Sequence, residues 1–576
     1  MNESRFKLFI TIIFLSFFIL ISRAMYIQIF HNSKYKKEVE ELSTKIITLN
    51  PIRGNIYDKN GILLAWNEKI YVIENFNESF SEKDLQLLKN VFSTITDSPE
   101  TYIDKLIFQK KLNIKLTPAN IKQISNIKGI RVSEKYIRKY KDNTIYPIIG
   151  YVNSEGVPLY GVEKLYNNIL EGKPGYQIVK ITPGGRIDKI LETVDPIKGK
   201  DLYLTIDYNL QKYIYDEMEK YKKPGAVIMS NPNDGSILAL VSYPSVEPNL
   251  FSSGLSIQDW KKIIYDTKQP LINRAISSVY APGSVIKPFF ALIGLEEGIS
   301  PEATIVCDGK FELKNSQGNV IAEYYDWNIF GHGVTDLVKS LRVSCNLYYY
   351  NLGLNLGIDT MSSYAKLFRL NDKTGIDLTG EINSVFPDRI WKKETFGKDW
   401  FIGETVLTSI GQGYMQFTPI GILRLYNILS TKGKYYKFHV LNKYVKNIYE
   451  KPVVYEKKLN FTYNINPVYY FNILKGLIEV TTFPGNSSNG GTAYHVFKDF
   501  KGLVAGKTGT AEVTGGKSPH SWFAGFMPAN NPEVSIVAFV ENGGYGSEVA
   551  APIARKALER YLFEKDLGEK NKPSKK

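Results

Sequence analysis

The chain has 576 residues, a hydrophobic fraction of 43% and a formal net charge of +14, from 72 Lys and Arg against 58 Asp and Glu. Domains commonly hold ~100–200 residues, so this length predicts two to four folded units. The sequence has no zinc-finger spacing, RNA-binding aromatic signature or long basic stripe, which argues against nucleic acid as a partner. The positive charge is that of dispersed, solubilising lysines, with attraction to an anionic surface as the alternative.

The N-terminus predicts a membrane helix. Residues 8–21 are apolar apart from Thr11 and Ser16, and Arg5 and Lys7 precede them, as expected for a start on the cytoplasmic side. Ser22-Arg23-Ala24 has the small-x-small pattern of a signal-peptidase site, so cleavage is the alternative. The apolar character resumes after Arg23, which favours an uncleaved single-pass anchor over residues 1–30 with the remaining residues exported to the outer, periplasmic side.

Residues 31–206 predict a stalk followed by a mixed, β-rich region. Residues 31–50 have the composition of a helical stalk, and 51–65 predict two strands joined by a turn at 59–61. Segments from about 70 to 150 are short and charged, without an evident site. A glycine-punctuated loop and a helix are expected over 150–175, and two strands over 184–207.

The pattern changes after Asp207. A helix is expected first, then a strand hairpin turning at 233–235, helical runs to about 480, three strands between 502 and 541, and a closing helix over 551–563. This order predicts an α+β domain over 207–565, with a sheet flanked by helices and strands from distant parts of the chain in that sheet. Residues 566–576 have the composition of a disordered basic tail.

A serine and a lysine three residues apart, Ser284 and Lys287, precede a long apolar run. The same spacing occurs at Ser4, Ser33, Ser125 and Ser363, so spacing alone carries little weight. Around Ser284 the context is distinctive: Gly283 permits a tight turn, Ser284 can cap a helix, and Pro288 falls in the first turn, where a missing N–H costs little. An N-capping serine with a snorkelling lysine is the structural alternative.

Two further patterns each occur twice. Ser344-Cys345-Asn346 is expected on a helix or at its start, whereas Ser487-Ser488-Asn489 lies in a Gly/Ser loop. Lys507-Thr508-Gly509-Thr510 lies in a small-residue strand, whereas Lys373-Thr374-Gly375 lies in a polar turn. The run 502–508 resembles a phosphate-binding loop but has three residues between its glycines instead of four, and no helix follows, so nucleotide binding is not expected.

Ser-x-x-Lys, Ser-x-Asn and Lys-Thr-Gly in this order resemble the motif set of the penicillin-binding proteins. The chain resembles a class B, monofunctional peptidoglycan transpeptidase over nearly its whole length, including "RGNIYDKNGILLA", "YGVEKLYNNILEG" and "NRAISSVYAPGSVIKP". Within the class, "WNIFGHGVTDLVKSLRVSCNLYYYNLG" and "WFIGETVLTSIGQGYMQFTP" are most similar to the elongation-specific branch. The division-specific branch is the nearest alternative.

The resemblance implies a serine acyl-enzyme mechanism without a metal or cofactor. A serine needs a base, and a lysine serves if its pKa is lowered by burial or nearby cations. Ser284 is then the nucleophile, Lys287 the base, and Ser344 a proton relay held by Lys287 and Lys507. The remaining implied roles are substrate binding by Asn346, Thr508 and Thr510, an open strand at Gly509, and an oxyanion hole of the Ser284 and Thr510 N–H groups.

The same resemblance implies peptidoglycan stem peptides and β-lactams as ligands, residues 51–200 as a non-catalytic pedestal, and elongation proteins as partners. One of these would be a membrane glycan-strand polymerase of the shape, elongation, division and sporulation family. A β-lactamase, a D,D-carboxypeptidase and a β-lactam sensor remain as alternatives. Cys307 and Cys345 form no metal-binding pattern, and two buried thiols are expected, with one bridge between them as the alternative. His332 and Trp327 are expected in a loop near the cleft.

Overall fold

The computed structural model describes residues 3–182, 187–445 and 451–570. Contacts divide it into two compact units, residues 1–54 with 171–199, and residues 55–170 with 200–576. The first unit contains α1 (Glu3–Phe30), α2 (Asn32–Ser43) and a three-stranded sheet of β1 (Thr44–Leu49), β8 (Gly175–Ile181) and β9 (Ile187–Val194). Within its described residues, α1 is long and apolar enough to cross a membrane, as the sequence predicts.

The helical stalk expected over 31–50 is only partly correct. Helix α2 ends at Ser43, and Thr44–Leu49 pair antiparallel with β8 as strand β1. The residues of this strand are rich in threonine and isoleucine, which favour strands because their branched side chains fit the pleated surface.

The N-terminal part of the second unit is built on a seven-stranded sheet. Its strands are β2 (Ile56–Tyr57), β3 (Leu63–Asn75), β4 (Lys111–Ile114), β5 (Ile130–Tyr140), β10 (Asp201–Leu204), β18 (Leu441–Val445) and β19 (Val453–Val454). Helices α3 (Glu82–Ser93), α4 (Pro99–Phe108) and α5 (Pro118–Ser125) pack against part of it. The expected turn at 59–61 joins β2 and β3. Because β18 and β19 come from beyond Asp207, this sheet includes chain from both sides of the boundary expected at 206/207.

Short elements connect this sheet to the rest of the unit: η1 (Asn143–Ile145), α6 (Tyr146–Ile149), β6 (Tyr151–Val152), β7 (Pro158–Tyr160), α7 (Gly161–Leu165) and α8 (Asn167–Leu170). The loop and helix expected over 150–175 are therefore present, together with a small hairpin of β6 and β7.

The second sheet of this unit has five antiparallel strands in the order β12-β11-β23-β22-β21. They are β11 (Gly225–Ser230), β12 (Ile237–Tyr243), β21 (Ala505–Ala511), β22 (His520–Met527) and β23 (Val534–Val540). The predicted hairpin and the three predicted late strands thus meet in one sheet, with β21 at its edge. Side chains alternate between two cores along β11, with Val227 and Met229 on one face and Ala226 and Ile228 on the other.

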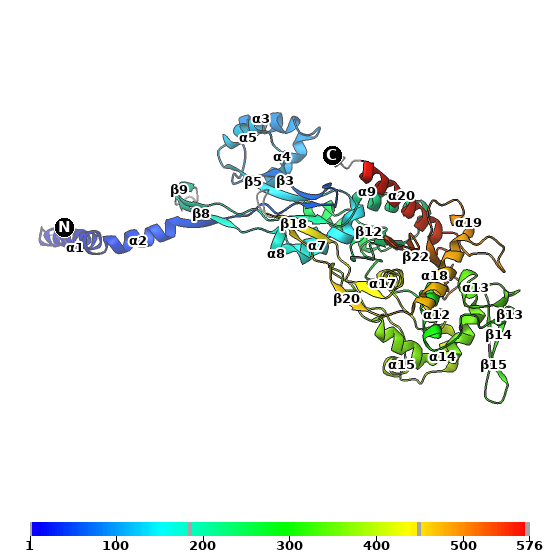
Figure 1. Cartoon of the computed structure of the whole chain (residues 1–576). Coiled ribbons are helices and arrows are strands. Elements are labelled where there is room, and N and C mark those ends of the chain that lie inside the picture. Colours follow the sequence, from blue (N-terminus) through cyan, green and yellow to red (C-terminus); the bar gives the residue numbers. More distant parts are fainter. Residues whose placement is uncertain (1–2, 183–186, 446–450, 571–576) are drawn as a thin grey trace. The chain divides into compact units, whose positions relative to one another are not determined.

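Helices cover both faces of this sheet (Figure 1). On one face lie α9 (Tyr208–Tyr221), α19 (Tyr494–Phe497) and α20 (Ala550–Lys570). On the other face, α17 (Pro419–Ser430) and α18 (Pro467–Thr482) contact the sheet. Helices α12 (Lys287–Glu296) and α13 (Leu337–Arg342) pack against α18, and α14 (Asn346–Leu367) packs against α12. This arrangement confirms the expected α+β fold class. The closing helix continues to Lys570, beyond the limit of 565 expected for the domain, and the rest of the expected tail, 571–576, lies outside the described residues.

The remaining elements are α10 (Asn249–Ser253), α11 (Ile257–Ile264), η2 (Gly283–Ile286), β13 (Ile305–Cys307), β14 (Lys310–Lys314), β15 (Val320–Tyr325), β16 (Gly333–Thr335), α15 (Arg389–Phe396), α16 (Ile402–Thr408), β17 (Lys434–Tyr436) and β20 (Leu459–Thr462). Of these, η2 matters most for the site, because it leads directly into α12, a helix buried on every side.

Candidate active site

Ser284 lies in the short 3-10 turn η2, immediately before α12, and its side chain is half-buried. Ser284 does not cap this helix, as the structural alternative would require: the N-cap of α12 is Ile286, and no side chain caps it. Pro288 occupies the first turn, as expected. Gly283 has a φ of +56°, and a Cβ added there would lie 2.7 Å from the Thr510 carbonyl oxygen, so glycine allows the turn to approach β21.

Lys287 is fully buried at the start of α12. Its Nζ donates hydrogen bonds to Asn346 Oδ1 (2.7 Å), to the Ser344 carbonyl (2.8 Å) and, at longer range, to Ser344 Oγ (3.4 Å). Burial lowers its pKa to about 8, although the charge of Asp326 acts in the opposite direction. The structure therefore brings Lys287 together with two of the residues expected to act with it, and it leaves Lys287 without a hydrogen bond to Ser284 within the described residues.

Ser344, Cys345 and Asn346 form the turn between α13 and α14. Ser344 has a φ of +59°, which costs free energy for a residue with a Cβ and is maintained here by the surrounding structure. Cys345 caps α14, since its Sγ accepts the Tyr348 N–H at 3.4 Å. This tight turn directs both the Ser344 carbonyl and the Asn346 amide toward Lys287.

The Lys-Thr-Gly-Thr run lies on β21, at the edge of the five-stranded sheet. Lys507 is fully buried and donates to the Thr508 carbonyl at 3.0 Å. Burial and the nearby charge of Lys287 lower the pKa of Lys507 well below its usual value. The Thr508 hydroxyl bonds to Thr492 at 2.7 Å, and the Thr510 hydroxyl accepts the Gly546 N–H at 3.3 Å.

Position 509 requires glycine because β21 packs closely against the turn that carries Ser284. A Cβ at Gly509 would lie 2.9 Å from Val285 Cγ1 and 3.2 Å from the Pro282 carbonyl oxygen. A larger residue would therefore push η2 away from β21. This is a different reason for glycine from the open strand expected from the family resemblance.

The competing copies of the motifs serve structural roles. On α14, the hydroxyl of the exposed Ser363 donates to the Thr360 carbonyl, and Lys366 forms an ion pair with Asp388 at 2.7 Å. The Thr374 hydroxyl and N–H both donate to Glu381. Asn489 accepts a hydrogen bond from Arg342 at 2.7 Å. The side chains of these competing copies are therefore engaged in contacts of their own.

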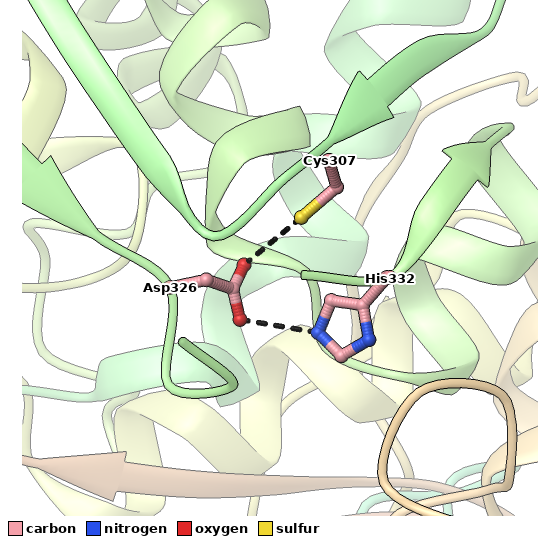
Figure 2. A group of neighbouring side chains, drawn as sticks. All are labelled: Cys307, Asp326 and His332. Carbon is pink, nitrogen blue, oxygen red and sulfur yellow. Dashed lines mark hydrogen bonds and ion pairs between the residues drawn. The ribbon is translucent and has the colours of Figure 1, made fainter. Parts of the chain in front are cut away.

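A buried cluster of Cys307, Asp326 and His332 supports the Ser344–Asn346 turn. One Asp326 oxygen faces His332 Nε2 (3.1 Å), and the other accepts from Cys307 Sγ (3.7 Å) (Figure 2). The second oxygen also accepts from the Asn346 N–H (2.7 Å). Hydrogen bonding from His332 and the charges of His332 and Lys287 lower the pKa of Asp326 against the opposing effect of burial. The carboxylate therefore fixes Asn346 from behind.

Sequence analysis missed this cluster. The three ligand atoms of Cys307, Asp326 and His332 lie within 4.8 Å of one another, and sulfur, nitrogen and oxygen together suit a divalent ion such as zinc. The signal available was the occurrence of both cysteines of the chain, three aspartates and one histidine within the 39 residues 307–345. Cys307 and Cys345 are both buried free thiols, as expected, and Trp327 donates to the Val343 carbonyl at 3.0 Å.

The family model for the penicillin binding protein transpeptidase domain matches residues 225–559, more than half of the 576 residues. The chain belongs to this family. A second model, the penicillin-binding protein dimerisation domain, matches residues 48–204. The resemblance to the penicillin-binding proteins that the sequence motifs indicated is therefore confirmed.

Individual relatives agree with the two models. The chain is 31% identical to the peptidoglycan D,D-transpeptidase MrdA of Acinetobacter baumannii, over 95% of this chain and 85% of the relative. The structure resembles penicillin-binding protein 2 (PBP2) of Helicobacter pylori in complex with MreC, with a TM-score of 0.73 and 28% identity over 90% of this chain and 99% of that one. It also resembles a chain of a peptidoglycan synthase complex that coordinates polymerization and crosslinking, with a TM-score of 0.73 and 25% identity over 97% and 98% of the two chains.

Proposed function

We propose that this penicillin-binding protein is a peptidoglycan D,D-transpeptidase of the elongation type, which crosslinks stem peptides through an acyl-enzyme on Ser284. The observation that carries the proposal is the fully buried Lys287, which donates to Asn346 and Ser344 beside the edge strand that carries Lys507. The likeness to MrdA and to PBP2 favours elongation over division, and transpeptidation over the hydrolysis catalysed by a carboxypeptidase or a β-lactamase.

The first chemical step needs a base for the Ser284 hydroxyl. With a pKa of about 8, roughly a tenth of Lys287 is neutral at pH 7. Neutral Lys287 takes the proton while Ser284 Oγ bonds to the carbonyl carbon of the penultimate D-alanine. The bond to the terminal D-alanine then breaks, and its nitrogen receives a proton through Ser344, which lies within reach of Lys287. An amine of a second stem peptide later displaces Ser284 and completes the crosslink.

The edge strand supplies the binding groups. Since β21 has a partner strand on one side only, its other edge can pair with an extended peptide. In this arrangement the Ser284 and Thr510 N–H groups stabilise the oxyanion, a contribution of about 3 kcal/mol per donor in comparable enzymes. The Thr508 and Thr510 hydroxyls bind the terminal carboxylate, and Asn346 binds the substrate amide.

Mass mapping with wild-type protein tests this function. We expect a fluorescent penicillin to leave one covalent adduct on the peptide that contains Ser284, and the protein to release D-alanine from a pentapeptide donor with transfer to an added amine acceptor. Release to water alone, without transfer, would favour a carboxypeptidase. An adduct on any other serine would contradict the assignment of the nucleophile.

Helix α1 is proposed to remain attached as a single-pass anchor in the cytoplasmic membrane, with the catalytic domain on its outer side. Mass spectrometry of protein extracted from membranes is expected to find the N-terminal segment still present. A mature chain starting at Met25 would show instead that residues 22–24 are a processing site.

The proposed partners are elongation proteins, including a membrane polymerase of glycan strands. The likeness to a PBP2 bound to MreC and to a synthase that couples polymerization to crosslinking supports this. We expect the full-length chain to co-purify with such a polymerase from its own cells after mild detergent extraction. The division polymerase serves as the comparison. If the division polymerase is recovered in preference to the elongation polymerase, the chain belongs to the division machinery.

A further inference from the structure

A pair of hydroxyl groups joins the edge strand of the proposed active site to a residue outside the three motifs. Thr508 Oγ1 lies 2.7 Å from Thr492 Oγ1, and either oxygen could be the donor. Thr508 lies on β21 and is 7% exposed, whereas Thr492 is half-buried in the stretch that leads into α19. The direction of this one hydrogen bond decides what Thr508 can offer to a ligand.

The chemistry of a carboxylate ligand sets that direction. A threonine hydroxyl has one proton to donate, whereas an ionised carboxylate only accepts. Under the proposed function, on which this inference rests, Thr508 and Thr510 bind the terminal carboxylate of the donor peptide. Thr508 can donate to that carboxylate only when its proton is not used in the bond to Thr492. Thr492 is then the donor of the pair, and Thr508 is the acceptor.

Thr510 has the same arrangement with a donor that is unambiguous. Its hydroxyl accepts the Gly546 N–H at 3.3 Å, and a backbone N–H only donates, so the Thr510 proton remains available to a ligand. Thr508 and Thr510 are two residues apart on β21, so their side chains lie on the same face of the strand. Two hydroxyls, each with a donor behind it, can thus offer their protons to one carboxylate.

The backbone around Thr492 is held by elements other than β21. The Thr492 N–H donates to the Arg342 carbonyl at 3.3 Å. A Cβ added at Gly491 would lie 2.2 Å from the Glu479 carbonyl oxygen, so the preceding residue packs directly against α18. The position of the Thr492 hydroxyl is therefore set independently of the strand that carries Thr508.

Arg342 connects the same stretch to the turn that contains Ser344. It is the last residue of α13, two positions before Ser344. Its guanidinium donates to Glu479 and to Asn489, both at 2.7 Å. The segment that ends at Thr492 is thus anchored to the chain next to one reacting group, while its hydroxyl contacts the strand that binds the carboxylate.

We propose that Thr492 is a positioning residue of the transpeptidase: its hydroxyl donates to Thr508 Oγ1 and so directs the Thr508 proton to the terminal carboxylate of the donor peptide. A hydroxyl that accepts a hydrogen bond is polarised by it, which strengthens the bond that the same hydroxyl donates. This arrangement favours a ligand group that only accepts. Thr492 therefore acts through Thr508 to favour a free carboxylate over a carboxamide, whose NH₂ group does not accept.

Two pentapeptide donors test this role, one ending in D-alanine and the other in D-alaninamide. Release of the terminal residue by full-length protein gives kcat/KM for each, and the measured quantity is the carboxylate-to-carboxamide ratio. Thr492→Val keeps the shape of the side chain but removes the donor, so the ratio should fall about fivefold to tenfold. Thr492→Ser keeps the hydroxyl and should stay within about twofold of wild type. A merely structural role would lower both rates and leave the ratio unchanged, and that result would overturn the proposal.

A double-mutant cycle with Thr508→Val tests whether Thr492 acts through Thr508. For the D-alanine donor, Thr492→Val should lower kcat/KM about fivefold to tenfold in the wild-type background. In the Thr508→Val background the same change should cost less than about twofold, because the hydroxyl that Thr492 directs is already absent. Equal losses in the two backgrounds would show that Thr492 does not act through Thr508.

Thr482→Val is the matched control. Thr482 is exposed at the end of α18, and its hydroxyl donates to the Ile478 carbonyl. This variant makes the same exchange of a hydroxyl for a methyl group ten residues before Thr492 and should keep the wild-type ratio. A fall in the ratio as large as that of Thr492→Val would point to a general effect of the segment and would overturn the proposal.

Penicillin labelling separates failure of this inference from failure of the proposed function. If wild-type protein forms the Ser284 adduct and releases D-alanine, but Thr492→Val changes neither the ratio nor the cycle, the transpeptidase proposal stands and the role of Thr492 falls. If neither an adduct at Ser284 nor D-alanine release is seen, the proposed function is wrong and the role of Thr492 falls with it.

Discussion

Replacing Ser284 with alanine is expected to abolish covalent penicillin labelling and D-alanine release. The change removes the only atom that can form the acyl bond in the proposed mechanism, and loss of a serine nucleophile in a comparable acyl-transfer enzyme costs on the order of 10⁶-fold in rate. Ser284 is half-buried and its side chain does not cap a helix, so removal of its hydroxyl should leave the fold intact. The measurement is the second-order acylation rate, with the thermal midpoint as the check on folding.

Ser363→Ala is the matched control for this prediction. Ser363 has the same spacing to a lysine, but its hydroxyl serves the backbone of α14 and Lys366 pairs with Asp388. This variant should label at the wild-type rate. Labelling that persists in Ser284→Ala, or that is lost in Ser363→Ala, would transfer the nucleophile to another position.

Local patterns predicted the elements of the transpeptidase domain well. The turn at 233–235, the late strands and the closing helix were all visible because each is encoded by adjacent residues and simple periodicity. The motif near Ser284 was separated from its competitors by glycine, proline and an apolar run, which are also local features. The separate sheet of β1, β8 and β9 was not predicted, because it pairs residues 44–49 with 175–181, and single-sequence patterns do not reveal partners so far apart.

The candidate site was predicted as a list of residues but not as a geometry. The hydrogen bonds from Lys287 to the Ser344–Asn346 turn agree with the expected grouping, whereas the positive φ of Ser344 has no local sequence signal such as glycine. The support of Asn346 by Asp326 was also missed, because the two residues are 20 positions apart and meet only through tertiary packing. The structural alternative, an N-capping Ser284, is not what the structure shows, because Ser284 lies inside the 3-10 turn η2 and does not cap α12.

The two buried lysines are expected to respond differently to arginine. Arginine keeps a positive charge but does not act as a base, because its pKa stays above ~12. Lys287→Arg should therefore lose acylation by ~100- to 10,000-fold, the usual contribution of a general base. Lys507→Arg should keep a measurable fraction of the acylation rate, because the proposed roles of Lys507 are to orient Ser344 and to pair as a cation with the substrate carboxylate once that carboxylate is bound.

The pH dependence distinguishes loss of the base from loss of packing. Burial lowers the pKa of Lys287 to about 8, and only the neutral amine accepts the serine proton, so the wild-type acylation rate should rise with pH and level off above about 8. Lys507→Arg should retain this rise at a lower rate, whereas Lys287→Arg should lose it, with circular dichroism confirming that both variants fold. Both arginines must fit fully buried positions, so Lys287→Gln, a neutral side chain that can still donate to the Ser344 carbonyl, serves as a second test. If Lys287→Arg acylates as fast as Lys507→Arg, or if Lys287→Gln keeps the rise in rate near pH 8, then Lys287 is not the base, and its hydrogen bonds to Ser344 and Asn346 serve only to hold the turn in place.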